Sequence, residues 1–467
     1  MGRHAPHRSR SDAGSSTPAA DFFARLHDQL GPEVDGLAEA LATPPAVSIR
    51  AHPAKWGAPT GLSNIPWCTH GYYLDERPSF TFDPLLHGGC YYVQEASSML
   101  LEQAVRATGL LHEPIVALDL CAAPGGKSTH LRSLLHSDAL VVSNEIDRRR
   151  QQVLVENLWK WGVGNTVITG AAPDKLQGLP GSFDLIVVDA PCSGEGMFRK
   201  DPFARAQWST DLVAQCCTMQ RDALDHAWRS LRPGGSLIYS TCTWEISENE
   251  AQVARLVAMG GTCLSIPIDA TWGVVRSQRE GVDALRCYPH RMRGEGFFLA
   301  VVRKEGNTTV RQEAPVPRTL EEVSVSTWLL PKCDWHLMER DEVLHAVDPR
   351  WSGTVNRIKM ALPVLSPGIP VAERKAGTWR PHPGLALSTD LDPSQFTNVP
   401  VDTASAIAYL QGHALPAQDA DGVGLVTYQA VPLGWVQGAG RRWNNRWPAP
   451  WRIRTQQPGA PRVSWSR

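Results

Sequence analysis

Two cysteines in matching surroundings, Cys192 and Cys242, carry the most distinctive chemistry of this 467-residue chain. Each lies shortly after an apolar run, residues 185–188 and 236–239 respectively, and such runs are typical of buried strands. A thiolate at a strand end can add to C6 of a pyrimidine, which makes C5 nucleophilic enough to take a methyl group from a sulfonium. For either cysteine taken alone, packing in the core is the alternative interpretation.

An acid, Asp189, closes the first apolar run and stands three residues before Cys192. In open α/β sheets an acid at a strand terminus usually faces the ligand crevice. Pro191 fixes the backbone just before Cys192, which gives the thiol a defined direction. An acid and two thiols at strand ends therefore favour a catalytic site over two unrelated core cysteines.

A glycine-rich turn lies in the stretch Leu-Asp-Leu-Cys-Ala-Ala-Pro-Gly-Gly-Lys-Ser, residues 118–128. Gly125 and Gly126 permit a tight turn and a close ligand approach, and the helix that follows offers free amides to a carboxylate or phosphate. Lys127 and the next serine resemble the end of a P-loop, but a P-loop needs glycine at the position of Cys121. The pattern predicts a nucleotide-type cofactor and excludes a P-loop ATPase; an ordinary strand–helix turn is the alternative.

Glu145 stands 20 residues after Gly125, at the end of the next predicted strand. In dinucleotide-type folds an acid at this place grips a ribose diol. The spacing is informative only together with the glycine turn. The alternative is a solvated charge beside Asp147.

Composition sets the outer limits on function. The length favours two to four domains, and a hydrophobic content of 42% supports a substantial core. The net charge of −1 does not indicate a nucleic-acid binder, so any RNA surface must come from local charge. No apolar run is long enough to span a membrane, and the charged start lacks the apolar region of a signal peptide. Ten cysteines without a CxxC pair argue against zinc or thioredoxin chemistry and predict a cytoplasmic protein without a metal.

Strand and helix patterns alternate through the middle of the chain. Strands are predicted at 115–120, 139–144, 166–169, 183–189, 236–241 and 297–302, and helices from about 127, at 150–159 and at 210–231. This alternation predicts an open parallel α/β sheet with the ligand at the carboxyl ends of the strands.

Changes in amino-acid composition and in the predicted secondary structure divide the chain into five predicted segments. These are a disordered tail over 1–20, an N-terminal module over 21–90, the α/β domain over 91–304, a linker and middle segment over 305–380, and a β-rich C-terminal domain over 381–467. The last segment is rich in glycine, proline and tryptophan and includes the strand-like piece 424–428.

The end of the chain supplies local positive charge, because no Asp or Glu occurs from Trp435 onward. Seven arginines alternate there with tryptophans: Arg441, Arg442, Arg446, Arg452, Arg454, Arg462 and Arg467 with Trp443, Trp447, Trp451 and Trp465. Guanidinium and indole groups suit phosphate contact and base stacking. A solvated basic tail is the alternative.

Three long motifs carry a family resemblance: the glycine-turn stretch, Asp-Ala-Pro-Cys-Ser-Gly-Glu-Gly-Met-Phe-Arg-Lys-Asp over 189–201, and Tyr-Ser-Thr-Cys-Thr over 239–243 followed by Glu-Asn-Glu. They resemble the Nop/Sun family of S-adenosylmethionine-dependent RNA 5-methylcytosine methyltransferases, over about residues 20–305. Tyr-Pro-His over 288–290, and Asn-Asn-Arg-Trp-Pro over 444–448 near the end, resemble the bacterial RsmF-type branch with its PUA-like RNA-binding domain.

The resemblance implies a Rossmann-like methyltransferase domain between an N-terminal α+β module and a C-terminal PUA-like domain, both gripping RNA. Cys242 is then the nucleophile, and Cys192 helps to eliminate the enzyme after methylation. The residues implied for S-adenosylmethionine are Cys121, Ala122, Ala123, Pro124, Gly125, Gly126, Lys127, Glu145 and Asp189. One departure concerns the adenine: Ala172 stands where the family often has an acid, and Asp174 is the nearest substitute.

The same resemblance implies 16S ribosomal RNA or the 30S subunit as substrate, and a monomeric enzyme. Two alternatives stay open. One is a transfer RNA cytosine-5 methyltransferase, and the other is a noncatalytic RNA-binding assembly factor that kept the fold. The presence of both cysteines argues against the second.

Overall fold

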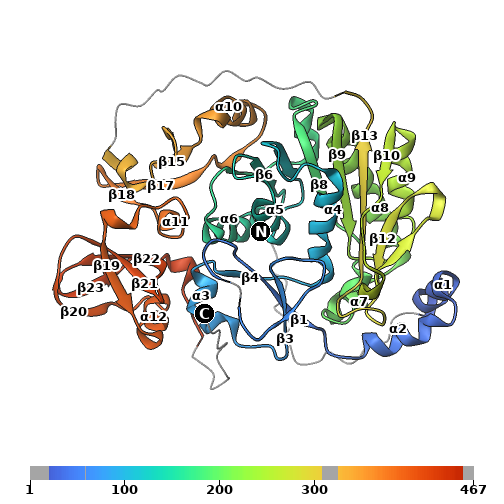
Figure 1. Ribbon diagram of the computed structural model, residues 1–467, viewed down its shortest axis with the longest axis horizontal. Coiled ribbons are helices and arrows are strands. Elements are labelled where there is room, and N and C mark those ends of the chain that lie inside the picture. Colours follow the sequence, from blue (N-terminus) through green and yellow to red (C-terminus); the bar gives the residue numbers. More distant parts are fainter. Residues whose placement is uncertain (1–19, 58, 308–323, 456–467) are drawn as a thin grey trace, which may run out of the picture.

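The computed structural model describes residues 20–57, 59–307 and 324–455 (Figure 1). The predicted tail over 1–20 falls almost wholly outside these ranges. Arg462, Trp465 and Arg467 of the basic end also lie outside them.

A ten-stranded sheet forms the centre of the described part of the chain. Its order is β11-β12-β13-β9-β8-β5-β6-β7-β16, with β10 paired to β13. The five central strands run parallel: β5 (Val116–Asp119), β6 (Leu140–Asn144), β7 (Thr166–Thr169), β8 (Phe183–Asp189) and β9 (Leu231–Thr241). The chain order reverses between β5 and β8, the place where open α/β sheets bind their ligands.

The expectation of a wholly parallel sheet is wrong at both sides of this core. β13 (Phe297–Lys304) runs antiparallel to β9. Beyond it in the sheet, β10 (Gly261–Leu264) and β12 (Ala284–Cys287) pair antiparallel with β13, and β11 (Val275–Ser277) pairs antiparallel with β12. β16 (Val364–Ser366) runs antiparallel to β7. Apolar runs indicate buried strands but carry no information on direction. The Rossmann-like α/β class itself is confirmed, as a mixed sheet.

Helices cover both faces of the sheet (Figure 1). They are α4 (Leu101–Thr108), α5 (Gly126–Leu134), α6 (Arg148–Trp161), α8 (Thr210–Ser230) and α9 (Glu250–Ala258). The short helix α7 (Pro202–Gln207) packs instead against the hydrophobic cluster around α1. Side chains alternate along β5, as the pleat requires. Val116 and Leu118 pack in the core shared with α8 and α9, whereas Ala117 packs in the core shared with α4 and α5.

The N-terminal module combines two helices, α1 (Ala20–Leu30) and α2 (Glu33–Leu41), with an antiparallel sheet. The sheet order is β2-β3-β1-β4, with β1 (Val47–Ala51), β2 (Ser63–Asn64), β3 (Gly71–Leu74) and β4 (Tyr91–Val93); α3 (Pro84–His87) precedes β4. Phe22 of α1 is fully buried against Phe198 and Trp244 of the central domain. This contact attaches the module to the loops that follow β8 and β9.

Two smaller sheets make up the C-terminal part, on the left in Figure 1. The first has the order β14-β15-β17-β18: β14 (His336–Arg340), β15 (Val343–Val347), β17 (Ile369–Lys375) and β18 (Thr378–Pro381), with α10 (Ser352–Ala361) between β15 and β17. The second has the order β19-β21-β22-β23-β20: β19 (Thr397–Val401), β20 (Leu415–Ala420), β21 (Val423–Tyr428), β22 (Val431–Gly438) and β23 (Gly440–Asn445), with α11 (Pro383–Ala386) and α12 (Thr403–Leu410) beside it. The described part of the predicted middle segment therefore has its own sheet, and it lends β16 to the central one.

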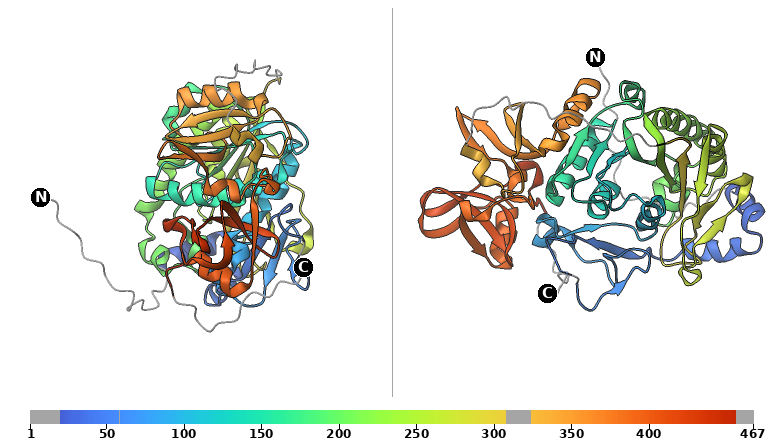
Figure 2. Two further views of the ribbon diagram at one scale, coloured as in Figure 1. Left: turned by 90° about the vertical axis from the view of Figure 1, so that its left-hand side faces the viewer. Right: turned by 45° about the horizontal axis from the view of Figure 1, so that its top comes forward.

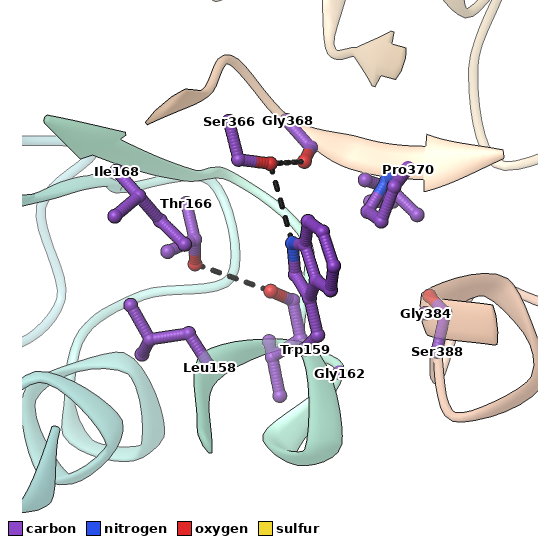
Figure 3. A pocket seen from close by; sticks show the side chains of 12 residues that line it. Leu158, Trp159, Gly162, Thr166, Ile168, Ser366, Gly368, Pro370, Gly384 and Ser388 are labelled. Atoms are coloured by element: carbon purple, nitrogen blue, oxygen red, sulfur yellow. Dashed lines mark hydrogen bonds between the residues drawn. The ribbon is translucent and has the colours of Figure 1, made fainter. Parts of the chain in front are cut away.

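The C-terminal part packs on the end of α6, as the right-hand view of Figure 2 shows. A crevice of about 20 Å³ marks this junction (Figure 3), where the Trp159 indole donates a hydrogen bond to Ser366 Oγ (3.3 Å). Gly162 ends the helix at a φ of 72°, and a Cβ there would lie 2.0 Å from the Leu387 carbonyl oxygen. Thr389 donates its backbone amide to the Gly162 carbonyl (2.8 Å). Only glycine fits at this helix end.

Within the described ranges, none of the helices has the length and apolar character needed to cross a membrane.

Candidate active site

The glycine turn links β5 to α5 and is held from several sides. Gly125 has a φ of 114°, in the left-handed region that favours glycine. The Ala122 amide donates to the Asn144 carbonyl (2.8 Å), and the Asn157 side chain donates to the Pro124 carbonyl (2.7 Å). Arg150 also donates to the carbonyl of Ala123. A fixed turn at the start of a helix presents backbone amides in a defined direction.

Glu145 follows β6 directly and is only 2% exposed. Its Oε1 accepts the Asp147 amide (2.9 Å), whereas its Oε2 is buried with no hydrogen-bond partner. The Arg150 guanidinium lies 3.4 Å from Oε2, outside hydrogen-bonding geometry. A buried carboxylate oxygen without a donor is costly unless a ligand supplies one. This rules out the alternative of a solvated surface charge.

Two further polar residues, which the sequence analysis did not single out, border the glycine turn. Asn144 donates to the carbonyls of Leu120 (3.1 Å) and Ala171 (2.9 Å), and so joins the ends of β5 and β7. Asp119, the last residue of β5, is fully buried and accepts from Ser128 Oγ (2.6 Å). Burial raises the pKa of Asp119 to about 7. An acid at the end of an apolar run, as at Asp189, was the available signal.

Lys127 and Asp189 form an ion pair across the switch point, with 2.8 Å between Nζ and Oδ2. Ser240 Oγ donates to the other carboxylate oxygen (2.8 Å). Burial by itself would lower the pKa of Lys127, but its charge interaction and hydrogen bond with Asp189 raise the pKa above the usual value. Lys127 is therefore a fixed cation, and Asp189 stays 35% exposed to a ligand.

The two predicted cysteines meet at the ends of adjacent parallel strands. Cys192 follows β8, Cys242 follows β9, and their Sγ atoms are 3.2 Å apart, both as free thiols. The contact with Cys242 and burial raise the pKa of Cys192 well above its usual range. Cys192 is therefore a protonated thiol in the free protein. It lies beside the Cys242 sulfur, where it can exchange a proton.

A buried carboxylate fixes the loop that carries Cys192. Glu248 Oε2 accepts the Ser193 amide (3.0 Å) and the Gln220 side-chain amide (2.8 Å). Gln220 also donates to the Pro191 carbonyl (2.8 Å), so the backbone is held on both sides of Cys192. Burial raises the pKa of Glu248 to about 7. Sequence reasoning quoted Glu248 only as part of a motif, because its contacts span 28 to 55 residues.

A second buried acid, Glu195, joins the same loop to the N-terminal module. Arg25 of α1 forms an ion pair with Glu195, and the Trp244 amide donates to the other oxygen (2.9 Å). The Gly196 amide donates to the Cys242 carbonyl (2.8 Å). The two cysteine loops are thus tied to each other and to α1.

Comparison with known proteins matches three family descriptions to successive parts of the chain. Residues 111–303 match 16S rRNA methyltransferase RsmB/F, residues 19–96 match the N-terminal domain of 16S rRNA methyltransferase RsmF, and residues 396–453 match the methyltransferase RsmF PUA domain. The chain is 32% identical over 439 residues to ribosomal RNA small subunit methyltransferase F of Pectobacterium atrosepticum, covering 85% of each chain. The chain belongs to the RsmF family of rRNA methyltransferases. The resemblance of the three motifs is thereby confirmed.

Other relatives agree with this RsmF assignment. The corresponding protein of Serratia proteamaculans is 31% identical over 417 residues, covering 83% of this chain and 84% of the relative. A solved methyltransferase homolog from Pyrococcus horikoshii has 26% identity and a TM-score of 0.52, covering 61% of this chain and 95% of its own. The structure of NSun6 from the same organism with SFG shares the fold, with 21% identity and a TM-score of 0.52, covering 62% of this chain and 99% of its own. The chain is an S-adenosylmethionine-dependent methyltransferase.

The residues implied for the cofactor of this RsmF chain lie together and fit it chemically. The turn from Cys121 to Lys127, Glu145 and Asp189 all lie at the carboxyl ends of β5, β6 and β8. The unpartnered Glu145 oxygen suits a hydroxyl donor, and burial raises the pKa of the Cys121 thiol so that it stays neutral. At the adenine position Ala172 is half-buried, whereas Asp174 is exposed and pairs with Lys175 (3.6 Å).

The tryptophans near the basic end of the chain were expected to stack on RNA bases, but the structure places Trp443 and Trp447 in the core. Trp435 and Trp447 are 2% exposed, and Trp443 is 8% exposed. Their indoles fill the cores of the C-terminal sheets, so they have no face left for a base. The interpretation as base-stacking residues is wrong for Trp443 and Trp447. Arg441 and Arg442 on β23, by contrast, are exposed.

A cleft of about 780 Å³ lies between the N-terminal module and the central domain, and Arg199 and Lys200 of the segment after Cys192 form part of its wall. Its basic lining residues are Arg77, Arg199 and Lys200. Glu295 pairs with both Arg199 (2.8 Å) and Lys200 (3.8 Å), which leaves Arg77 as the more available cation. Sequence patterns could not indicate this cleft, because its walls come from segments far apart along the chain.

Proposed function

We propose that this chain methylates C5 of a cytosine in 16S ribosomal RNA through a covalent adduct on Cys242. The carrying observation is the 3.2 Å contact of the two sulfur atoms at the ends of β8 and β9, beside the Lys127–Asp189 pair. Adjacent thiols at a ligand crevice suit an addition followed by an elimination.

S-adenosylmethionine, when bound, supplies a methyl group on a sulfonium. The residues that would hold it are the turn from Cys121 to Lys127, Glu145 and Asp189. Glu145 would accept a ribose hydroxyl at its unpartnered oxygen, and the fixed turn would present its amides. Asp189 and Lys127 would border the reacting base.

The thiols divide the covalent work. Cys242, as thiolate, forms a bond to C6 of the cytosine, and the electron pair of the C5–C6 bond moves to C5 for methyl transfer. The Cys242 contact that raises the pKa of Cys192 changes once the Cys242 sulfur is bonded to C6, so Cys192 can then release its proton to solvent. The Cys192 thiolate takes the proton from C5, the C5–C6 double bond re-forms, and the Cys242 thiolate leaves. Glu248 and Gln220 keep the backbone at Cys192 in place for this step.

The target base must leave its stack to reach the two sulfur atoms, at a cost of about a few kcal/mol. The cleft with the basic lining residues Arg77, Arg199 and Lys200 is the proposed approach of the RNA strand, since its wall includes part of the segment that follows Cys192. Exposed Arg441 and Arg442 of the PUA domain provide a second phosphate-binding surface.

We further propose that a monomer acts on the 30S subunit in the cytoplasm. Candidate RNA surfaces contributed by separate parts of one chain support a monomer, and ten free thiols suit a reducing compartment.

Bisulfite sequencing of ribosomal RNA tests the proposal. A strain that lacks this gene should lose one or more protected cytosines in 16S RNA, and the full chain should restore them. A Cys242→Ala variant of equal abundance should not. Unchanged 16S RNA with lost methylation in transfer RNA would redirect the substrate, and restored methylation by Cys242→Ala would exclude the covalent mechanism.

A further inference from the structure

A second group of potential ligands lies outside the methyltransfer site. Cys68, Glu102 and His130 are each at most 4% exposed, and one donor atom from each lies within 4.8 Å of the others. Cys68 belongs to the N-terminal module, Glu102 to α4 and His130 to α5. The helices α4 and α5 pack side by side (Figure 1). The cluster therefore lies where the module meets the central domain.

Two distances from His130 Nε2 describe this cluster. Glu102 Oε2 lies at 3.7 Å, beyond a hydrogen bond to oxygen, and Cys68 Sγ lies at 3.7 Å, within hydrogen-bonding distance of sulfur. An N–H···O hydrogen bond needs about 2.7–3.2 Å. Two ligands on one tetrahedral zinc, with bonds of about 2.0–2.3 Å, are separated by about 3.4–3.6 Å. The observed spacing is close to that of ligands around a shared ion.

The imidazole of His130 presents one ring nitrogen to the other two donors. The side chain is 1% exposed, and its Nε2 faces both Glu102 and Cys68. An imidazole nitrogen is the commonest metal ligand in proteins.

Glu102 and Cys68 complete the donor set. Both are buried, and Glu102 is held in place by the Thr69 amide (3.0 Å), the Thr69 hydroxyl (2.5 Å) and an ion pair with Arg106 (2.8 Å). Because a metal binds cysteine as the thiolate, uptake releases the thiol proton.

We propose that Cys68, Glu102 and His130 bind a structural zinc ion, with water as the fourth ligand. A set of thiolate, imidazole and carboxylate donors suits zinc and disfavours magnesium or calcium. The ion would cross-link the N-terminal module to α5, the helix that begins at the glycine turn. The ligands lie 34 and 28 residues apart, so no sequence motif could reveal them.

Metal analysis of the full chain tests this proposal. The protein, purified under reducing conditions, is stripped with a chelator and titrated with Zn²⁺, and separately with Co²⁺ as a spectroscopic probe. We expect one equivalent of tightly bound zinc, a thiolate-to-cobalt charge-transfer band, and a rise of the unfolding temperature with Zn²⁺. Affinity should also increase with pH.

Substitutions locate the site. Cys68→Ala should remove the cobalt band and weaken zinc binding by more than roughly tenfold, and His130→Gln should do the same if Cys68→Ala unfolds the protein. Cys90→Ala, at another buried cysteine of the same module, is the matched control and should bind as the parent does. No bound metal and no cobalt band in the parent chain, or equal binding by the Cys68 and Cys90 variants, would overturn the zinc site.

Discussion

The crevice of the central domain and the C-terminal sheets both contain side chains whose types suggest a function. In the crevice these side chains lie at the candidate site, whereas in the C-terminal sheets the tryptophans belong to the core. At the crevice, the two cysteines lie at strand ends with their sulfur atoms in contact, and the turn glycines follow the end of β5, as their positions predicted. In the C-terminal sheets, the tryptophans that suggested base stacking are buried in the core. A position at the end of a strand constrains where a side chain points, whereas composition alone does not distinguish a binding surface from a core.

The largest expected effect concerns the two thiols. Cys242→Ala should lower methyl transfer by more than about a thousandfold and form no covalent RNA adduct, because it removes the attacking group. Cys192→Ala should instead accumulate an adduct that survives denaturing electrophoresis. Cys263→Ala, at a half-buried cysteine of β10, should behave as the parent. Normal turnover by Cys192→Ala, or an adduct with Cys242→Ala, would show that the roles are wrong.

The buried tryptophans give the next effect, on stability. Trp447→Ala should destabilise the protein by about 3–5 kcal/mol, because it leaves a cavity in the C-terminal core. Urea unfolding followed by fluorescence measures this. A stable Trp447→Ala variant that loses only RNA affinity would restore the stacking interpretation. Deleting 435–467 cannot make the distinction, since it also removes core residue Trp435.

The cofactor contact gives an intermediate effect. Glu145→Ala should weaken S-adenosylmethionine binding by about 1–3 kcal/mol, the cost of removing a charge-assisted hydrogen bond. Calorimetry on the purified chain measures it. Glu156→Ala, on the adjoining helix α6, should bind with parental affinity. Unchanged affinity in Glu145→Ala would place the ribose contact at another residue.

Glu248 predicts a dependence of stability on pH. Its pKa is about 7 in the folded protein against 4.5 as an ordinary side chain, so the folded state keeps a proton that the unfolded state releases. Stability from this group is full below pH 4.5 and is lost as the pH rises through 7. Glu248→Gln should therefore be more stable than the parent at pH 8, by about 1–3 kcal/mol.

Denaturation of both proteins at several pH values checks this prediction. The gain should vanish at low pH. Glu280→Gln, an exposed substitution, should leave the profile unchanged. A Glu248→Gln variant with the parental pH profile would contradict the raised pKa.

The smallest effect concerns the exposed arginines. Replacing Arg441 and Arg442 by glutamine should weaken RNA binding and lower the salt slope by about 1 for each phosphate that is no longer neutralised. Filter binding over a range of salt concentrations measures both quantities, and cofactor affinity should not change. Equal affinity and slope would leave these residues as solvated charge.

The sequence predicted the central strands well because each is a short apolar run between turn residues. It also placed the glycine turn, Glu145 and both cysteines, whose positions depend only on local chain geometry. It could not predict the direction of β13, nor contacts such as Arg25 with Glu195, which join segments 170 residues apart. The hydrogen bonds by which Glu248 and Gln220 hold the backbone around Cys192 were missed for the same reason, since no local sequence pattern marks a single buried glutamate.

The helix α6 connects the cofactor side of the molecule with its outer parts. It has 14 residues and a length of about 21 Å. Arg150 near its start contacts the glycine turn, and at its far end Lys55 Nζ donates to the Lys160 carbonyl (2.6 Å). A Cβ at Gly89 would lie 1.8 Å from that carbonyl oxygen, as tight as the fit of Gly162 against Leu387. Both sides of this helix end fit too tightly to change alone, so replacing one of the three parts by itself should disturb its contact with the others.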